Sequence, residues 1–358
     1  MKVLFTHELF PPDVRGGGEM CAFQAAQALV ARGVEVHVLT TGDPRVTERA
    51  GIPTQRLPIS RYRMNLATAD IARAAAGADV IQTFNYHACL PSLRAGRQLN
   101  KPVICIVLGL FGPLWREMKP FPAGWAWQAW ERFQLRAGFD CLVFISEYSR
   151  REAKGMIGES QRTLALHPGI EAGRFRPAEA KEDVVLFNGK FDLRKGVFEV
   201  IEVAKALPEV RFRMYGFGPE EANLRRVAPP NVEVRTYIEA DRRLDLTDSS
   251  GLPHLLARAR ICLLPSKAET FGFALIQAMA AGCAIISSIP LEFAGRRVGA
   301  EDTPAMIEAV RQLWQDRVAS LDAGRRNVEL SRQYTWDRFA AGLVELYEQL
   351  LREKRQRQ

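Results

Sequence analysis

The stretch Pro265-Ser-Lys-Ala-Glu-Thr-Phe-Gly-Phe-Ala-Leu-Ile-Gln-Ala-Met-Ala-Ala-Gly-Cys283 lies between two short apolar runs, Ile261–Leu264 and Ala284–Ile286. Both runs have the length and composition of buried parallel strands. Between them, apolar residues recur at helical spacing up to Gly282, which stands where a helix C-terminal glycine is expected. The stretch therefore predicts a strand, a loop, a helix and a second strand.

The loop of this stretch carries Glu269 and then Phe271-Gly272-Phe273, directly before the expected helix. The first N–H groups of a helix are unpaired and attract anions, and α/β sheets bind ligands at the carboxyl ends of their strands. A carboxylate beside such a helix start suits sugar hydroxyls, while the amides suit phosphate. An ordinary strand-to-helix turn would explain the same residues, because short motifs are weakly specific.

The size of the chain predicts two domains, because 358 residues exceed the size at which one core stops growing. A content of 47% hydrophobic and 25% charged residues is that of an ordinary globular protein. The six cysteines are dispersed, mostly in apolar runs, without a Cys-x-x-Cys pair. They indicate core residues in a reducing compartment, neither a metal site nor disulfides.

The formal charge of +8 favours an anionic partner, either nucleic acid, an acidic lipid surface or a phosphorylated substrate. No zinc-finger spacing, RNA-recognition aromatic signature or long basic arm is present, so we expect no nucleic-acid partner. The N-terminal residues lack a secretory apolar region, and the uncharged stretch 102–115 is too short to cross a bilayer. We therefore expect a cytoplasmic protein.

A glycine loop stands at the first turn of a predicted βαβ unit. The expected strand Lys2–Thr6 is followed by Gly16, Gly17 and Gly18, and then by a helical pattern and the strand 34–39. Glycines allow a phosphate to approach the backbone and leave N–H donors uncovered. The spacing is not G-x-G-x-x-G, which argues against a nicotinamide or flavin dinucleotide.

A basic loop follows a predicted strand at 184–188 in the second half of the chain. It contains Gly189, Lys190 and Lys195 ahead of a further helix. Cations at the carboxyl end of a strand suit a diphosphate, whose negative charge grows when the bond to it breaks. A merely solvated basic loop is the alternative.

Four motifs, which follow one another along the chain in the order of the family, resemble those of the retaining glycosyltransferases of family 4, and the resemblance covers nearly the whole chain. The organising stretch keeps Pro265, Ser266, Glu269 and Gly272 of the family pattern, with Gln277 where a second Glu usually stands. The remaining matches are the glycine loop with Pro11, Pro12 and Glu19, the basic loop with Lys195-Gly196, and a hinge at 168–177.

The resemblance implies an α/β fold of the GT-B type, with two Rossmann-like, doubly wound domains facing across a cleft. Residues 1–172 would form the acceptor-side domain and residues 173–335 the domain that binds the donor. The C-terminal helix 336–351 would pack back on the first domain.

The implied reaction is transfer of a sugar from a nucleoside diphosphate sugar to an acceptor hydroxyl, with retention at the anomeric carbon. The acceptor would be a glycan or a lipid-linked glycan. We expect no cofactor and no metal, because lysines, glycine amides and the helix start can neutralise the diphosphate. The catalytic residues would be Glu269, Lys195 and Lys190. The substrate-binding residues would be Gly16, Gly17, Gly18, His87, Gly189, Phe271, Gly272, Phe273 and Gln277.

Three family positions are altered in this chain. Leu108 replaces a common histidine, Lys190 replaces a commoner arginine, and Gln277 replaces a glutamate. A catalytically weak GT-B-like partner subunit is therefore an alternative, and a GT-B sugar-nucleotide epimerase is a second one.

An aromatic and basic segment, residues 111–136, contains four of the six tryptophans. Ala126, Trp130, Phe133 and Ala137 fall on one predicted helical stripe, with charges on the other side. Docking at the cytoplasmic face of an anionic membrane, core packing, or the wall of an acceptor cleft would each explain the stripe.

Three further segments carry expectations. Residues 84–87, ending in His87, follow a predicted strand and suit the lining of an acceptor site, although a structural histidine explains them too. The charged run 239–250 indicates a surface loop. After Ile286, we expect residues 287–292 to enter a helix directly.

Overall fold

The computed structural model describes residues 1–13, 16–171, 173–238 and 250–356. Its contacts divide the chain into two compact units, each described here by itself. Unit 1 consists of Met1–Gly169 and Trp336–Gln358, and unit 2 of Ile170–Thr335. Residues 239–249 of the charged run lie outside the described residues.

Unit 1 is built on a sheet with the order β3-β4-β2-β1-β5-β6-β7-β8 among the described residues. The strands are parallel except for the antiparallel pair β3 and β4. The strand order turns around at β1, which pairs with β2 on one side and with β5 on the other. The strands are β1 Lys2–Thr6, β2 Glu35–Thr41, β3 Glu48–Arg49, β4 Ile52–Leu57, β5 Val80–Phe84, β6 Val103–Val107, β7 Cys141–Phe144 and β8 Thr163–Ala165.

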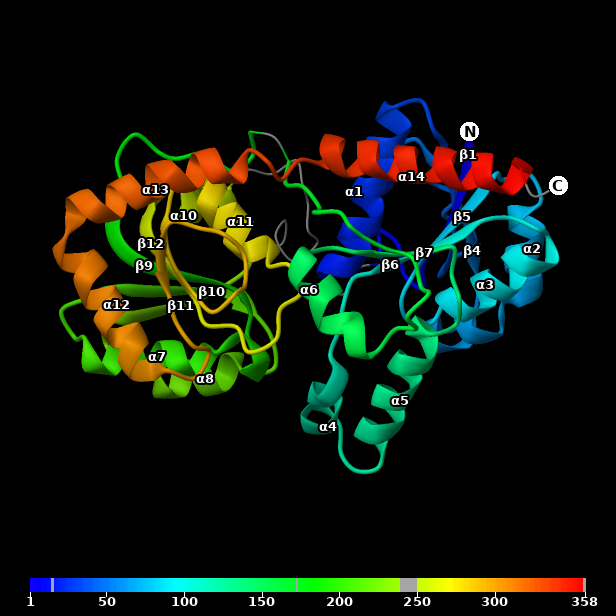
Figure 1. Cartoon of the computed structure of the whole chain (residues 1–358). Helices are drawn as coiled ribbons and strands as arrows, with labels where there is room; N and C mark the ends of the chain where they lie inside the picture. Colours follow the sequence, from blue (N-terminus) through cyan, green and yellow to red (C-terminus); the bar gives the residue numbers. More distant parts are fainter. Residues whose placement is uncertain (14–15, 172, 239–249, 357–358) are drawn as a thin grey trace. The chain divides into compact units, whose positions relative to one another are not determined.

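Helices cover both faces of this sheet because its central strands are buried on both sides. α1 lies beside the C-terminal helix α14, and α2 packs against α3 (Figure 1). α14 buries Phe339, Leu343 and Leu346, and its Tyr347 hydroxyl donates to Gln82 in β5. The helices of unit 1 are α1 Gly17–Ala31, η1 Arg61–Leu66, α2 Thr68–Ala75, α3 Cys89–Gln98, η2 Gly112–Leu114, α4 Trp115–Met118, α5 Ala123–Leu135, α6 Glu147–Glu152, η3 Ala153–Gly155 and α14 Trp336–Gln356.

Unit 2 has a second parallel sheet, in the order β11-β10-β9-β12-β13-β14 among the described residues. α10, α11 and α13 lie on one face, and α7, α8 and α12 on the other (Figure 1). The elements are β9 Glu182–Lys190, η4 Leu193–Lys195, α7 Val197–Ala206, β10 Phe212–Phe217, α8 Glu221–Val227, β11 Val232–Thr236, α10 Gly251–Arg258, β12 Ala259–Leu264, α11 Phe273–Ala280, β13 Ala284–Ser287, β14 Gly295–Arg297, α12 Thr303–Gln315 and α13 Arg317–Ser331.

The organising stretch folds as its sequence predicts. Its loop joins β12 to α11, and β13 follows in parallel register with β12. Gly282 has φ 73°, the left-handed conformation that ends a helix, and an added Cβ would lie 3.0 Å from Pro177 Cγ. The two Rossmann-like sheets confirm the predicted fold class. The six cysteines are free and buried, as expected.

Two local expectations were wrong. Residues 287–292 do not enter a helix, because β14 adds a further parallel strand before α12 begins at Thr303. The second expectation, that the charges of α5 lie on a polar side away from the stripe, was wrong for Glu131, which is 1% exposed, whereas Phe133 of the stripe is 61% exposed. The charged residue therefore belongs to the buried face, because three hydrogen-bond donors surround its carboxylate.

Candidate functional site

The predicted donor-site residues of unit 2 follow the two central strands of its sheet. β9 and β12 are neighbours, and the strand order turns around between them. The basic loop follows β9, and the loop of the organising stretch follows β12. The carboxyl edge at such a switch point is where an open α/β sheet forms a ligand crevice.

Lys195 and Glu269, which lie 74 residues apart in the chain, are in direct contact. The Lys195 ammonium donates to Oε2 of Glu269. The two side chains are 25% and 21% exposed, so the pair is accessible to a ligand and only partly shielded from water. Two of the three predicted catalytic residues are thus brought together in one partly open ion pair.

The backbones of the two loops are also joined. The Lys267 N–H donates to the Arg194 carbonyl at 2.8 Å. Gly196 has φ 70°, and an added Cβ would overlap the Pro265 carbonyl oxygen. Glycine is therefore required at this contact for two reasons, the left-handed backbone and the close approach of Pro265.

The start of α11 lies in this loop, as predicted. Gly272 precedes the helix with φ 88°, and an added Cβ would lie 2.9 Å from Ile289. The Phe271 side chain does not face a ligand, because it is 1% exposed and packs against Phe273 and Tyr334. Only the backbone of Phe271 is suited to the predicted substrate contact. Gln277 follows one turn into α11 and is half-buried.

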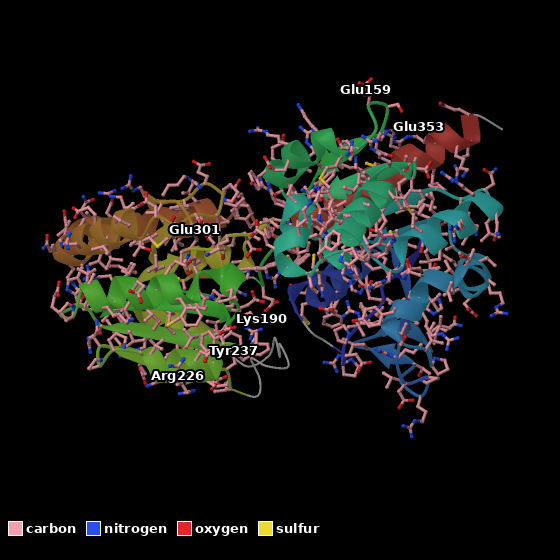
Figure 2. All side chains as sticks on the ribbon, turned by 90° about the horizontal axis from the view of Figure 1, so that it is seen from below. Glu159, Lys190, Arg226, Tyr237, Glu301 and Glu353 are labelled. Carbon is pink, nitrogen blue, oxygen red and sulfur yellow. The ribbon has the colours of Figure 1, made fainter. Side chains whose placement is uncertain are left out.

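Lys190 ends β9 and is exposed, and its neighbour Gly189 has φ 152°. Lys190 lies opposite Phe217 in the β9–β10 ladder. Figure 2 shows Lys190 and Tyr237 on the same side of unit 2. Sequence analysis missed the ring cluster here, in which Tyr237 lies 5.3 Å from Phe217 and 4.8 Å from Tyr215. Aromatic residues at the ends of β10 and β11 were the available signal.

The remaining predicted residues belong to unit 1. Gly16 precedes α1, and its N–H donates to Oε2 of Glu19 at 3.0 Å. The Gly16 N–H therefore already has an acceptor. The N–H groups of Gly17 and Gly18 belong to the first turn of α1. An added Cβ on Gly18 would lie 3.3 Å from Leu108, so the glycine loop lies beside the end of β6.

His87 is 5% exposed and lies in the turn after β5. Its Nδ1 lies 2.8 Å from the Asn65 amide nitrogen, which also donates to the Tyr62 carbonyl. Burial lowers the pKa of His87, and the Glu8 carboxylate opposes this shift. The predicted histidine therefore stands beside an acidic residue that sequence analysis missed.

A second buried glutamate organises the loop after β6. Glu131 accepts hydrogen bonds from the Tyr86 hydroxyl at 3.0 Å, the Phe111 N–H at 3.1 Å and the Gly112 N–H at 2.7 Å. Burial raises the pKa of Tyr86 well above its usual range, and Glu131 adds to this shift. Nothing in the sequence distinguished Glu131 from the exposed Arg132 beside it.

The aromatic segment has two different faces. Trp115, Trp127 and Trp130 turn inward and form ring contacts with one another and with Tyr86 and His87. On the other face, Phe121, Trp125 and Phe133 are 84%, 53% and 61% exposed. The Arg116 guanidinium lies 3.5 Å from the centre of the Trp125 ring. The segment therefore combines a packed wall with an exposed aromatic and basic surface.

The described residues also bear on other kinds of site. No group of three or more His, Cys, Asp or Glu side chains there is arranged to hold a metal ion. No helix in the described ranges is both long and apolar enough to span a membrane. A hollow of about 640 Å³ lies at the amino ends of β1 and β2, beside Lys2 and Val34, and thus at the opposite edge from the predicted site.

Both halves of the chain match glycosyltransferase families. Residues 16–169 match the glycosyl transferase 4-like domain, and residues 182–316 match the glycosyl transferases group 1 domain. The two matches fall within unit 1 and unit 2, respectively.

Relatives with curated functions are distant. The chain is 26% identical to the D-inositol 3-phosphate glycosyltransferase of Segniliparus rotundus, over 54% of this chain and 48% of that protein. It is 24% identical to the phosphatidyl-myo-inositol mannosyltransferase of Mycobacterium leprae, over 94% of both chains. The chain thus spans about half the length of the first relative and nearly all of the second.

Solved structures share the fold over almost the whole chain. The sucrose-phosphate synthase from Thermosynechococcus elongatus has a TM-score of 0.82 at 20% identity, covering 98% of this chain and 99% of that one. Anabaena Alr3699/HepE in complex with UDP-glucose has a TM-score of 0.77 at 15% identity, covering 98% and 100%.

Proposed function

This chain belongs to the family 4 glycosyltransferases of GT-B fold, and on that premise we propose that it transfers a sugar from a nucleoside diphosphate sugar to an acceptor hydroxyl. We further propose that the anomeric configuration is retained and that the reaction needs no metal ion or cofactor. The observation that carries the proposal is the contact of Lys195 with Glu269 at the switch point of unit 2.

Positive charge for the departing diphosphate would come from Lys195, Lys190 and the start of α11. Lys190 and Lys195 flank a loop at the carboxyl end of β9, and α11 begins after the neighbouring strand β12. Preorganised cations and helix N–H groups stabilise charge that develops on a leaving group, which is the role otherwise filled by a magnesium ion. In unit 1, Gly17 and Gly18 begin α1, and the first N–H groups of a helix suit an anion.

Glu269 would accept hydrogen bonds from hydroxyls of the donor sugar, and Gln277 from those of the ribose. A bound diphosphate would share the Lys195 ammonium that now contacts Glu269. The Glu269 carboxylate then turns to neutral hydroxyls, for which it is a strong acceptor. The pair therefore holds both groups near their working positions before the donor arrives.

The acceptor would be a glycan or a lipid-linked glycan, reached from the cytoplasmic face of a membrane. The exposed Phe121, Trp125 and Phe133 of the α4–α5 segment support this proposal. Aromatic side chains with nearby cations suit the interface of an anionic bilayer. Arg116, beside Trp125, supplies one such cation.

The test is turnover of a nucleotide-sugar panel with a lipid-phosphate extract, comparing wild type with Lys195→Met and Glu269→Gln. Lys205→Met is a matched control, because Lys205 also pairs with a glutamate but on the exposed side of α7. We expect transfer to fall at least about 100-fold in the two site variants and to persist in the control. Product NMR reports the anomeric configuration, and chelator-treated enzyme tests metal independence.

A wild type that binds a nucleoside diphosphate but transfers no sugar would contradict the proposed activity and favour the partner-subunit alternative. Interconversion of nucleotide sugars without an acceptor would favour the epimerase. Equal activity of Lys195→Met and Lys205→Met would contradict the role of the ion pair.

A further inference from the structure

Unit 1 contains a buried carboxylate to which the proposed donor chemistry assigns no role. Glu8 follows β1 and is 5% exposed. Its Oε1 lies 3.6 Å from Nη2 of Arg61, and its Oε2 has no hydrogen-bond partner. Burial raises the pKa of Glu8, while His87 and Arg61 oppose this shift. An unpartnered carboxylate oxygen in such a place is costly to the fold and suggests a ligand.

The position of Glu8 at the edge of the sheet also suggests a ligand. Glu8 follows β1 and His87 follows β5, and these adjacent strands flank the point where the strand order of unit 1 turns around. The carboxyl ends of strands at a switch point form the crevice in which α/β sheets bind ligands. Glu8 and His87 therefore belong to the same edge of the same sheet, at its switch point.

The hydrogen bonds of His87 define what it offers a ligand. The Asn65 amide nitrogen donates to the Tyr62 carbonyl at 3.0 Å, which fixes the orientation of the amide. The same nitrogen faces Nδ1 of His87 at 2.8 Å, so Nδ1 is an acceptor. A neutral His87 then carries its proton on Nε2, and burial, by lowering its pKa, favours the neutral ring. His87 thus supplies a donor beside the acceptor Glu8.

Aromatic rings surround His87. The rings of Tyr62, Trp130 and Trp127 lie 5.2, 5.3 and 6.0 Å from the His87 ring. Tyr62 is 58% exposed, so the cluster reaches solvent on the side of η1. Apolar ring faces with a few convergent polar groups suit a small ligand that has both C–H faces and hydroxyls.

On the basis of the proposed glycosyl transfer, we propose that Glu8, His87 and Arg61 form the acceptor subsite of unit 1 and that it selects a neutral polyhydroxy ring over a phosphorylated one. Glu8 accepts a ring hydroxyl, and His87 donates to a neighbouring one. The Arg61 side chain is 26% exposed, and its 3.6 Å contact is longer than a hydrogen bond. Arg61 therefore lies on the Oε1 side of Glu8 and leaves Oε2 as the acceptor for a hydroxyl.

The selectivity follows from charge. A phosphate placed at Glu8 would bring two negative groups together in a buried, poorly solvated place, where repulsion is strong. Arg61 offsets this repulsion only in part, because it lies 3.6 Å from Oε1 and leaves Oε2 without a partner. A hydroxyl instead donates to the free oxygen and satisfies it.

The test uses the full chain and four probes, the neutral myo-inositol and methyl α-D-glucopyranoside and the anionic myo-inositol 1-phosphate and glucose 6-phosphate. Binding is measured by saturation-transfer NMR and by tryptophan fluorescence, because the Trp127 and Trp130 rings lie next to the His87 ring. At least one neutral probe should bind ten or more times tighter than its phosphorylated counterpart. Glu8→Gln should weaken binding of the neutral probe at least fivefold and reduce the preference over the phosphorylated probe. His87→Phe, which keeps an aromatic ring, should also weaken binding of the neutral probe.

Glu35→Gln is the matched control, since Glu35 lies at the amino end of β2 in the same sheet and its side chain is 67% exposed. Thermal melting checks that each variant is folded. If Glu8→Gln does not fold, Glu8→Asp and His87→Phe carry the test. Tighter binding of the phosphorylated probes, no binding of either neutral probe, or unchanged affinity in the folded variants would overturn the proposal.

Nucleoside diphosphate binding and donor turnover are measured on the same proteins. If wild type turns over a donor and the Glu8 and His87 variants keep full affinity for polyols, the subsite is refuted and the proposed glycosyl transfer is not. Wild type that binds polyols but no nucleoside diphosphate would refute glycosyl transfer instead.

Discussion

Replacing Glu131 with glutamine should loosen the loop after β6 without unfolding the protein. In the native structure, Oε1 accepts from the Tyr86 hydroxyl and the Phe111 N–H, and Oε2 accepts from the Gly112 N–H. Glutamine keeps one oxygen and places an NH₂ group where the other was. At least one of the three donors therefore loses its acceptor and faces another donor.

The magnitude follows from the number and kind of these bonds. A hydrogen bond to a charged acceptor contributes about 1.5–3 kcal/mol, and a buried donor left unpaired costs about 1–3 kcal/mol. We therefore expect local opening of the loop to become easier by about 2 kcal/mol or more. Since 1.4 kcal/mol corresponds to a factor of ten, the amides of Phe111 and Gly112 should exchange with solvent about 30-fold faster.

Hydrogen exchange, followed by mass spectrometry on a peptide that covers residues 109–114, measures this change directly. Arg132→Gln serves as the control, because Arg132 is the next residue of α5 and its side chain is exposed. Its exchange should match that of wild type. Unchanged exchange at Phe111 and Gly112 in a folded Glu131→Gln protein would refute the assignment of Glu131 as the acceptor that holds this loop.

Three further outcomes are expected. Gly196→Ala should lower the melting temperature more than Gly33→Ala. Both glycines have positive φ, but only a Cβ on Gly196 would overlap Pro265, and this overlap should destabilise the fold by about 1–3 kcal/mol more. Equal shifts of the melting temperature would contradict the close contact. Burial raises the pKa of Glu8 above its ordinary value of 4.5, so the folded carboxyl holds its proton longer than the unfolded one and wild type loses stability as pH rises from 4.5. As the pH rises from 4.5, the melting temperature of Glu8→Gln should therefore increase relative to that of wild type. A difference in melting temperature that does not change with pH would contradict the raised pKa of Glu8. The double variant Trp125→Ser/Phe133→Ser should reduce co-sedimentation with anionic vesicles at least fivefold. Val318→Ser, which changes an apolar residue that is 76% exposed on unit 2, should leave it unchanged. Equal co-sedimentation of the double variant and wild type would argue against docking through α5.

Much of the fold could be predicted from local sequence. The central strands of both sheets are short apolar runs, and the helices between them have apolar residues at helical spacing, so burial of those residues dictates the elements. Gly282 ended α11 as expected, because only glycine adopts that backbone without cost. The motif residues Lys195 and Glu269 could be named because each follows a strand at the carboxyl edge.

The errors have a common physical cause. The helical pattern of α5 placed the apolar stripe with Phe133 on one side and the charges on the other, but the buried face is decided by which groups satisfy one another. Glu131 is buried because Tyr86, Phe111 and Gly112, from other parts of the chain, converge on its carboxylate. No periodicity within the helix contains that information.

The chain's own order of residues thus determined which segments are strands, helices and glycine turns, and which family motifs they carry, because these depend on neighbours within a few positions. Only the tertiary structure decided that Lys195 contacts Glu269 across 74 residues, that the Phe271 side chain belongs to the core, and that Glu8 lies buried beside Arg61 with an unpartnered oxygen. Contacts of this kind arise from strand order, since adjacent parallel strands bring residues that are distant in sequence to one edge of a sheet.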